Sequence, residues 1–395
     1  MAGRRKKKAS ASAGGKDRFE DLPDHVLEQL LSFLPSQEAV QTCVLAKRWR
    51  HIWKSVSSLR IHTDKFETEE QSNTFVNKVV ELRDPTAPLH VCEMVPYDDI
   101  ESWLQYAVAC KMQVLRVEGN PYYISQSQLS NNSVISEHLT RLVLYHVEID
   151  SLDLSRCEAL EVFEINDCII NLEDICGKSL RHLIIRDSSI CTTCVRTRIS
   201  APGLVTCELA DCRDFTPLFG SLPSLVTAFI RIILESEEDC DGLCKGFCCK
   251  DDYSVLLEGL SGATNLELFC ESWAMIFSKD LRWRPMFGRL KTVSLNDWCV
   301  TDNFTGLIYF LQHSPILERL TLQLSSSLKS SRKILKSKIP REQFLVSKHL
   351  KVVEIKSYNV KNIQICQIAN LLGTLGVTWE KINIDEDFCY GSDCK

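Results

Sequence analysis

The chain has 395 residues, of which 45% are hydrophobic and 25% are charged, as expected of a folded globular protein. Its formal net charge is −6, and because residues 1–16 carry six basic side chains and no acid, the remainder carries −12. That balance argues against a general nucleic-acid binder, and no stretch approaches the ~20 apolar residues that span a bilayer.

Residues 1–16 are predicted to form a disordered basic tail. The run from Arg4 to Lys8 fits a nuclear localisation signal, and it fits equally a solvated tail that carries no address. We expect neither a signal peptide nor a prenylation box, because no apolar run follows Met1 and Cys394 lies one residue from the end. The expected location is the nucleus and/or the cytoplasm, where the 19 cysteines stay free thiols.

Residues 17–62 predict a compact module of three short helices. Pro23 suits the first turn of the first helix, and Pro35 ends it. Between the two prolines, apolar residues recur at helical spacing and give one apolar stripe. The stripe consists of Val26, Leu27, Leu30, Leu31 and Leu34.

The second and third helices of this module follow within a few residues. Ser36 is expected to cap the second helix, which carries Val40, Cys43 and Val44. Trp49 and Trp53 are four residues apart and therefore share one face of the third helix. Three short helices cannot bury this much apolar surface among themselves, so the excess predicts a partner.

Residues 17–62 resemble the F-box of plant F-box proteins, through Leu22-Pro23, the apolar stripe, Leu34-Pro35 and the segment 44–53. The resemblance implies binding to a Skp-family adaptor, which joins an F-box protein to a cullin. The implied interface consists of Leu22, Pro23, Val26, Leu27, Leu30, Leu31, Leu34, Pro35, Val44, Leu45, Trp49 and Trp53. The alternative is a generic helical bundle whose stripe is only its core.

Two positions depart from the F-box pattern. Ala46 stands where the family usually has Ser, and His25 stands where it usually has an acid. Ala46 removes a helix cap worth ~1 kcal/mol, so docking is expected to be weaker than usual. The sequence predicts that charging Leu30 and Leu31 together, each to Asp, abolishes adaptor binding while the rest of the chain stays folded.

Residues 63–112 are interpreted as a connecting segment that leads into a repeat array over residues 113–339. The pattern Leu-x-x-Leu-x-Leu, with apolar substitutions, first returns at steps of 21, 20 and 24 residues and later at 27 and 33. The clear matches begin at Leu139, Leu160, Leu180, Leu204, Leu290, Leu317 and Leu350, and weaker ones lie around Leu115, Leu225, Leu266 and Ile382. The early steps are typical of leucine-rich repeats, which stack one short strand per unit. The predicted fold class is α/β: an N-terminal three-helix F-box and a leucine-rich-repeat solenoid with a curved parallel β-sheet.

The repeat also predicts the environment of some cysteines. Cys168 and Cys212 each fall three residues after the last apolar position of a repeat, where the motif places an inward-pointing Asn or Cys. Residues 340–395 are predicted to hold terminal repeats, and the segments 349–355 and 382–384 resemble the FBD segment that closes many plant F-box/LRR proteins.

Two further groups of cysteines are weighed as sites. An acidic insertion at 235–252 carries Cys240, Cys244, Cys248 and Cys249, without paired Cys-x2-Cys knuckles or a histidine, so a solvated loop is favoured over zinc. Cys191 and Cys194 have redox spacing but lie between repeat strands. With no catalytic fingerprint either, we expect no metal, no cofactor and a non-catalytic subunit.

Contact with a protein substrate is expected at the exposed positions of the repeat strands. The substrate-binding candidates are Arg141, Glu164, Arg181, Arg186, Lys291, Arg319 and Lys351. The resemblance therefore implies the substrate-recognition adaptor of a Skp–cullin–F-box ubiquitin ligase. A non-ligase F-box/LRR scaffold shares every feature, and a ligand-dependent co-receptor would need a dense basic cluster on the concave face.

Overall fold

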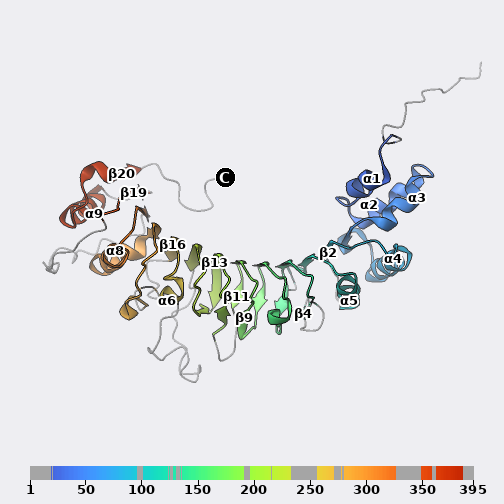
Figure 1. Cartoon of the computed structure of the whole chain (residues 1–395), viewed down its shortest axis with the longest axis horizontal. Coiled ribbons are helices and arrows are strands. Elements are labelled where there is room, and N and C mark those ends of the chain that lie inside the picture. The colour runs from blue at the N-terminus through green and yellow to red at the C-terminus, as the bar shows by residue number, and fades with distance from the viewer. Residues whose placement is uncertain are drawn as a thin grey trace, which may run out of the picture.

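The computed structural model forms an elongated arc. It describes residues 19, 21–95, 101–122, 124, 128–129, 134, 136–190, 196–214, 216–232, 256–270, 277, 280–325, 348–357 and 362–385. A small group of helices lies at one end of the arc, and the last helix and strand lie at the other end (Figure 1). A parallel sheet runs along the inner side between them.

The N-terminal helices are α1 (Asp24–Leu31), α2 (Ser36–Gln41) and α3 (Trp49–Ile52), with 3-10 turns at Thr42–Val44 and Trp53–Ser55. Their small separate core consists of Leu27, Leu31, Ala39, Trp49, Ile52 and Val56. The predicted N-cap at Ser36 is wrong by one residue, because Pro35 holds that place. The buried Ser36 hydroxyl instead accepts a hydrogen bond from the amide of Arg60, at 3.0 Å.

The main sheet consists of short parallel strands that pair in chain order. They are β1 (Ser58–His62), β2 (Val91–Val95), β3 (Val114–Glu118), β5 (Arg141–Tyr145), β7 (Val162–Asn166), β10 (His182–Arg186), β13 (Thr206–Asp214), β15 (Thr227–Ile232), β16 (Asn265–Cys270), β17 (Thr292–Asn296), β18 (Arg319–Leu324), β19 (Val352–Ser357) and β20 (Ile382–Asp385). Equivalent apolar residues pair across strands, as Leu142, Phe163 and Leu183 do, and form one continuous core. The open parallel solenoid is therefore confirmed, including strands at the weaker matches.

The solenoid starts earlier than the boundary at residue 113 predicted from the sequence. β1 lies within residues 17–62, and it pairs in register with β2, which in turn pairs with β3. The interpreted connecting segment thus holds β2 and two helices, α4 (Glu69–Leu82) and α5 (Glu101–Ala109). Cys92 and Met94 occupy the core positions of β2 where later repeats have leucine, which hides the motif.

Repeat length decides what covers the outer side of the sheet. The short repeats return through two- or three-residue parallel strands, since about 20 residues leave little room for a helix. These are β4 (Gln128–Leu129), β6 (Glu148–Ile149), β8 (Ile169–Ile170), β9 (Asp174–Cys176), β11 (Ser189–Ile190), β12 (Arg198–Ser200) and β14 (Leu218–Phe219). Other connections carry α6 (Leu257–Leu260), α8 (Thr301–His313), α9 (Asn362–Thr374) and 3-10 turns at Thr63–Lys65, Leu154–Arg156, Leu281–Trp283, Asp297–Val300 and Trp379–Lys381.

The cysteines predicted at the inward slot of the repeat are buried. The thiols of Cys168 and Cys212 lie 3.2 Å and 3.7 Å from the backbone carbonyl oxygens of Asn166 and Ile185. Burial raises the pKa of each thiol to about 12, so both stay protonated and unreactive at neutral pH. Their structural role is confirmed.

The other weighed sites lie outside the described residues, at Cys191–Cys194 and in the insertion 235–252. Within the ranges that the structure does describe, no group of His, Cys, Asp and Glu side chains could hold a metal ion. No helix in those ranges is long and apolar enough to cross a bilayer.

Candidate functional site

The N-terminal helices expose large apolar side chains on their outer surface. Phe33 is 70% exposed, Val44 is 83% exposed and Leu45 is 69% exposed, and Leu30 is 43% exposed. Residues of this size and type usually lie in a core or an interface. We call Leu30, Phe33, Val44 and Leu45 the apolar surface of the N-terminal helices.

The structure divides the predicted adaptor-binding residues into three groups. Leu27, Leu31 and Trp49 are buried in the core of the N-terminal helices. Half-buried positions are Leu22, Val26, Leu34, Pro35 and Trp53, and exposed positions are Pro23, Leu30, Val44 and Leu45. Charging Leu31, which is 2% exposed, would unfold these helices, so the double change at Leu30 and Leu31 does not isolate the interface.

Phe33 was missed by sequence reasoning because it falls off the helical stripe. It lies in the turn after α1, where helical spacing no longer predicts which side chains are exposed. Arg48 was also missed as an organising residue. Its guanidinium donates to the Asp24 carboxylate at 2.8 Å and to the carbonyl of Phe19 at 3.3 Å, which holds the start of α1 against the start of α3.

The two departures from the family pattern are both exposed. His25 lies in the first turn of α1. The N-cap of α3 is Arg48, whereas Ala46 lies two residues earlier and only its carbonyl is used, accepting from the Trp49 amide at 3.1 Å. The prediction that Ala46 removes a cap from α3 is therefore wrong.

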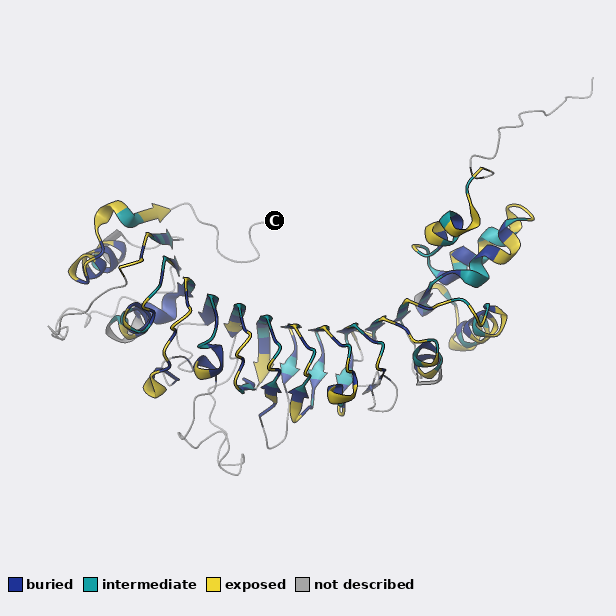
Figure 2. Cartoon of the chain, viewed as in Figure 1, coloured by how far each residue is buried: buried dark blue, intermediate teal, exposed yellow. Residues whose placement is uncertain are grey.

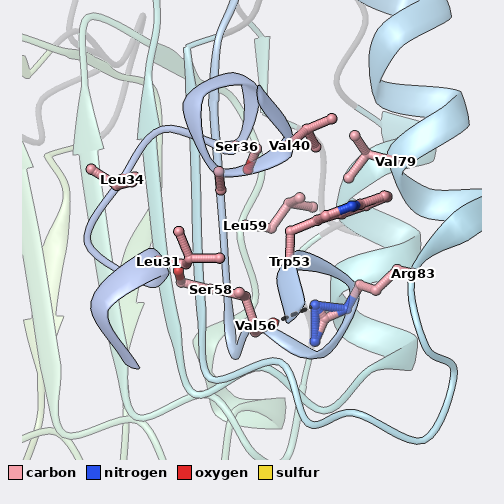
Figure 3. A pocket seen from close by; sticks show the side chains of 11 residues that line it. Leu31, Leu34, Ser36, Val40, Trp53, Val56, Ser58, Leu59, Val79 and Arg83 are labelled. Carbon is pink, nitrogen blue, oxygen red and sulfur yellow. Dashed lines mark hydrogen bonds between the residues drawn. The ribbon is translucent and has the colours of Figure 1, made fainter. Parts of the chain in front are cut away.

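The N-terminal helices are fastened directly to the first strand of the solenoid. The hydroxyl of Ser58 in β1 donates to the carbonyl of Ser32 at 2.6 Å, and the Arg60 guanidinium donates to the same oxygen at 3.1 Å. The buried Arg83, which follows α4, donates to the carbonyl of Val56 at 2.7 Å (Figure 3) and to that of Pro88 at 2.8 Å. A cavity of only about 20 Å³ remains at this junction, so little space is left for the helices to shift.

The inner face of the sheet holds the positions that alternate with the buried ones along each strand (Figure 2). Four predicted substrate-binding residues lie on this face: Arg141, Glu164, Arg186 and Arg319. Arg181, Lys291 and Lys351 are exposed and lie just before a strand, at the edge of the face. The sequence therefore predicted as one binding surface two sets of residues that the structure separates, those on the inner face and those at its edge.

Charged residues of the first half of this face contact one another. The Glu164 carboxylate lies 2.9 Å from the Arg141 guanidinium and 3.4 Å from that of Arg186. Arg186 also binds both oxygens of Glu208, at 2.6 Å and 2.8 Å. We call Arg141, Glu164, Arg186 and Glu208 the Arg–Glu ladder. Its parallel register places these charges on adjacent strands, where opposite charges stabilise a sheet.

Similar pairs lie at both ends of the solenoid. Glu93 in β2 forms ion pairs with Arg60 and, at 3.9 Å, with Arg116. Toward the other end, Arg319 pairs with Glu354, and Lys351 pairs with Glu318 at 2.6 Å. Most of the charges predicted to contact a substrate are thus neutralised within the molecule. Among the described residues of this face no dense basic cluster gathers, and the ligand-dependent co-receptor finds no support there.

Comparison with known proteins places this geometry in context. Residues 19–61 match the model of the F-box domain. One F-box/FBD/LRR-repeat protein of Arabidopsis thaliana is 27% identical to this chain, covering 92% of the chain and 91% of that protein. A second protein of that name and organism is 25% identical, covering 83% and 81%. An FBD-associated F-box protein of Arabidopsis thaliana is 26% identical, covering 78% and 84%.

The predicted F-box and the resemblance to plant F-box/FBD/LRR-repeat proteins are thereby confirmed. The matched residues 19–61 nearly coincide with the predicted 17–62, and they contain the whole apolar surface of the N-terminal helices. Their last residues form most of β1, so this F-box shares an element with the repeat sheet. The chain therefore carries an F-box domain at residues 19–61, followed by a parallel repeat solenoid, and is similar over most of its length to F-box/FBD/LRR-repeat proteins.

Proposed function

We propose that this chain is the substrate-recognition subunit of a Skp–cullin–F-box ubiquitin ligase. One observation carries the proposal: an F-box exposes the apolar surface formed by Leu30, Phe33, Val44 and Leu45 beside a complete small core of its own. Exposed apolar area of this kind is stabilised by burial against a partner. The Skp-family adaptor is the partner whose binding an F-box implies, and the cullin follows through it.

The proposed division of labour follows from the shape of the molecule. The F-box lies at one end of the arc, and its bonds to β1 fix its orientation relative to the inner face (Figure 1). A protein substrate bound on that face would be held at a set distance from the adaptor. Ubiquitin transfer would be performed by other subunits, with this chain a non-catalytic, cofactor-free component of the nucleus and/or cytoplasm.

Adaptor binding is tested with the purified full-length chain and a plant Skp-family adaptor in a pull-down. Phe33→Asp and Leu45→Asp are expected to abolish capture, because each buries a charge in the proposed interface. Met286→Asp is the matched control, since Met286 is 58% exposed and lies far along the solenoid. Unchanged capture by both F-box variants would refute the proposed interface.

Ligase function is separated from a non-ligase scaffold by a reconstituted reaction. The chain, the adaptor and a cullin with its catalytic partners are incubated with a protein that the solenoid captures. Transfer of ubiquitin to that protein, lost with Leu45→Asp, supports the substrate-receptor function. Capture without transfer under conditions that ubiquitinate a control receptor's substrate supports the scaffold instead.

A further inference from the structure

The inner face changes character between β13 and β16. The central position of the strands is Glu208 in β13, Phe229 in β15, Glu267 in β16 and Ser294 in β17, and these residues are register partners in that order. Two residues after Glu267, Phe269 occupies the next position on the same face. We call Phe229, Glu267 and Phe269 the aromatic–acidic patch.

Glu267 differs from the other glutamates at this position of the repeat. Glu93, Glu164, Glu208 and Glu354 each have an arginine within 4.0 Å. The register neighbours of Glu267 are Phe229 and Ser294, and the diagonal Arg231 on β15 is bonded to Asp211. Among the described residues none forms a hydrogen bond or ion pair with the Glu267 carboxylate. Partial burial raises the pKa of Glu267, and the Lys356 charge opposes this shift without reversing it. A charged carboxylate here is partly dehydrated and lacks the compensation that its equivalents have.

The rings beside this carboxylate form an apolar corner. Phe229 and Phe269 pack edge to face, with ring centroids 5.7 Å apart and an interplanar angle of 75°. Phe269 is buried and Phe229 is half-buried, so the Phe229 ring stays accessible from the inner side of the arc. The Arg231 guanidinium lies 5.8 Å from the centroid of Phe229, while the Asp211 carboxylate accepts its hydrogen bond at 2.7 Å. The Phe229 ring therefore already lies near one guanidinium, that of Arg231, whose charge is neutralised by Asp211.

We propose that the aromatic–acidic patch binds an arginine side chain of the captured protein. This inference rests on the proposed function and names the chemistry of its substrate contact. A guanidinium is planar, stacks on an aromatic face and donates two parallel hydrogen bonds to a carboxylate. Those properties match the Phe229 ring and the Glu267 carboxylate together. The charge of −12 carried by the chain beyond residue 16 attracts a basic partner at longer range.

The test uses a phage-displayed library of random peptides, selected on the purified full-length chain. The selected peptides are expected to contain arginine, and their affinity is measured by fluorescence anisotropy. Glu267→Gln and Phe229→Ala are each expected to weaken binding by about tenfold or more, because they remove the carboxylate and the accessible ring. The matched control is Glu164→Gln, a central glutamate paired within the ladder, which is expected to change affinity by less than about twofold.

Three results would overturn the proposal. They are peptides without a basic residue, binding that is unaffected by Glu267→Gln, and failure to select any peptide. A chain that lacks residues 1–16 is measured in parallel. The selected peptides bind the full-length chain, so an affinity more than about tenfold higher for the shortened chain would identify the basic tail as the occupant of the patch, and the captured protein would then not be the source of the arginine.

The adaptor pull-down separates this inference from the proposed function. Glu267→Gln is expected to retain full adaptor capture, because the patch lies on the solenoid and not on the F-box. Loss of arginine peptides with capture intact supports the patch. Arginine peptides bound through Glu267 by a chain that captures no adaptor would leave the site valid and refute the ligase function.

Discussion

The Arg–Glu ladder and the aromatic–acidic patch lie on the inner face of neighbouring repeats, but the charges of the ladder are paired within the molecule and the carboxylate of the patch is not. In the ladder, Glu164 lies between Arg141 and Arg186, and each charge finds its partner on an adjacent strand. In the patch, the equivalent Glu267 lies between Phe229 and Ser294 and gains no such partner. Repeat position alone therefore does not determine whether a side chain stabilises the sheet or remains available to another molecule. The residues on the two flanking strands determine it.

This contrast changes which residues merit attention on the inner face. The sequence favoured charged residues as substrate contacts, yet ladder charges would have to exchange an internal partner for an external one. Such an exchange yields little net binding free energy. The Glu267 carboxylate, unpaired beside the accessible Phe229 ring, keeps its full capacity to bind a cation. The following predictions test this difference, from the largest expected effect to the smallest.

The two phenylalanines of the patch should differ in their structural cost. Phe269→Ala is expected to lower the free energy of unfolding by about 3 kcal/mol, because it removes a buried ring that packs against Phe229 on the inner face. Phe229→Ala should cost only about 1 kcal/mol, since its ring is already half in solvent. Urea denaturation followed by circular dichroism measures both. An equal decrease in the free energy of unfolding for both variants would mean that the Phe229 ring is buried and not accessible to a ligand.

Removing a ladder charge should destabilise the chain. Glu164→Gln is expected to lower the free energy of unfolding by about 1–2 kcal/mol, because a carboxylate that is mostly buried loses its bonds to two arginines. The same denaturation experiment measures it, with Glu118→Gln as a control for a half-buried glutamate that has one arginine partner. A stability equal to that of the wild type would show that the ladder is only a surface arrangement.

Removing the patch charge should have the opposite sign. Folding raises the pKa of Glu267 above its ordinary value of 4.5. The contribution of Glu267 to the free energy of unfolding is therefore fully present below pH 4.5, where the carboxyl is protonated, and is lost as pH rises through the folded pKa. Glu267→Gln should therefore increase the free energy of unfolding at pH 7 by a few tenths of a kcal/mol, after allowance for solvent screening. The gain should shrink as pH is lowered towards 4.5, measured by thermal unfolding at several pH values. A destabilised variant at pH 7 would indicate an internal cation partner.

The sequence predicted the solenoid well because its signal repeats. Each Leu-x-x-Leu-x-Leu match fixes which side chains enter the core, and in-register stacking then follows from burial of the apolar rows. The two-residue outer strands, such as Ile169–Ile170, were beyond prediction, since two apolar residues do not specify an element. The ladder was also hidden. Residues 22 positions apart pair only because repeat length brings Glu164 opposite Ile184 and so places Arg186 diagonally across from it on the adjacent strand.

The F-box shows the same limit at shorter range. Helical spacing placed Leu30 and Leu31 in one stripe, but α1 is only eight residues long, and its packing against α3 buries Leu31 and leaves Leu30 outside. A stripe on so short a helix spans both core and surface. The exposed Phe33 lies beyond the helix, where no periodicity applies. Identification of the module was possible from sequence, whereas division into core and interface needed the fold.

The most direct test of the account is the affinity of the full-length chain for a plant Skp-family adaptor, measured by isothermal titration calorimetry. The chain carrying both Phe33→Asp and Leu45→Asp is expected to show no measurable binding, a loss of at least about 100-fold, with its repeats still folded by circular dichroism. Met286→Asp should bind as the wild type does. An unchanged affinity of the double variant would contradict the adaptor function of the exposed F-box surface.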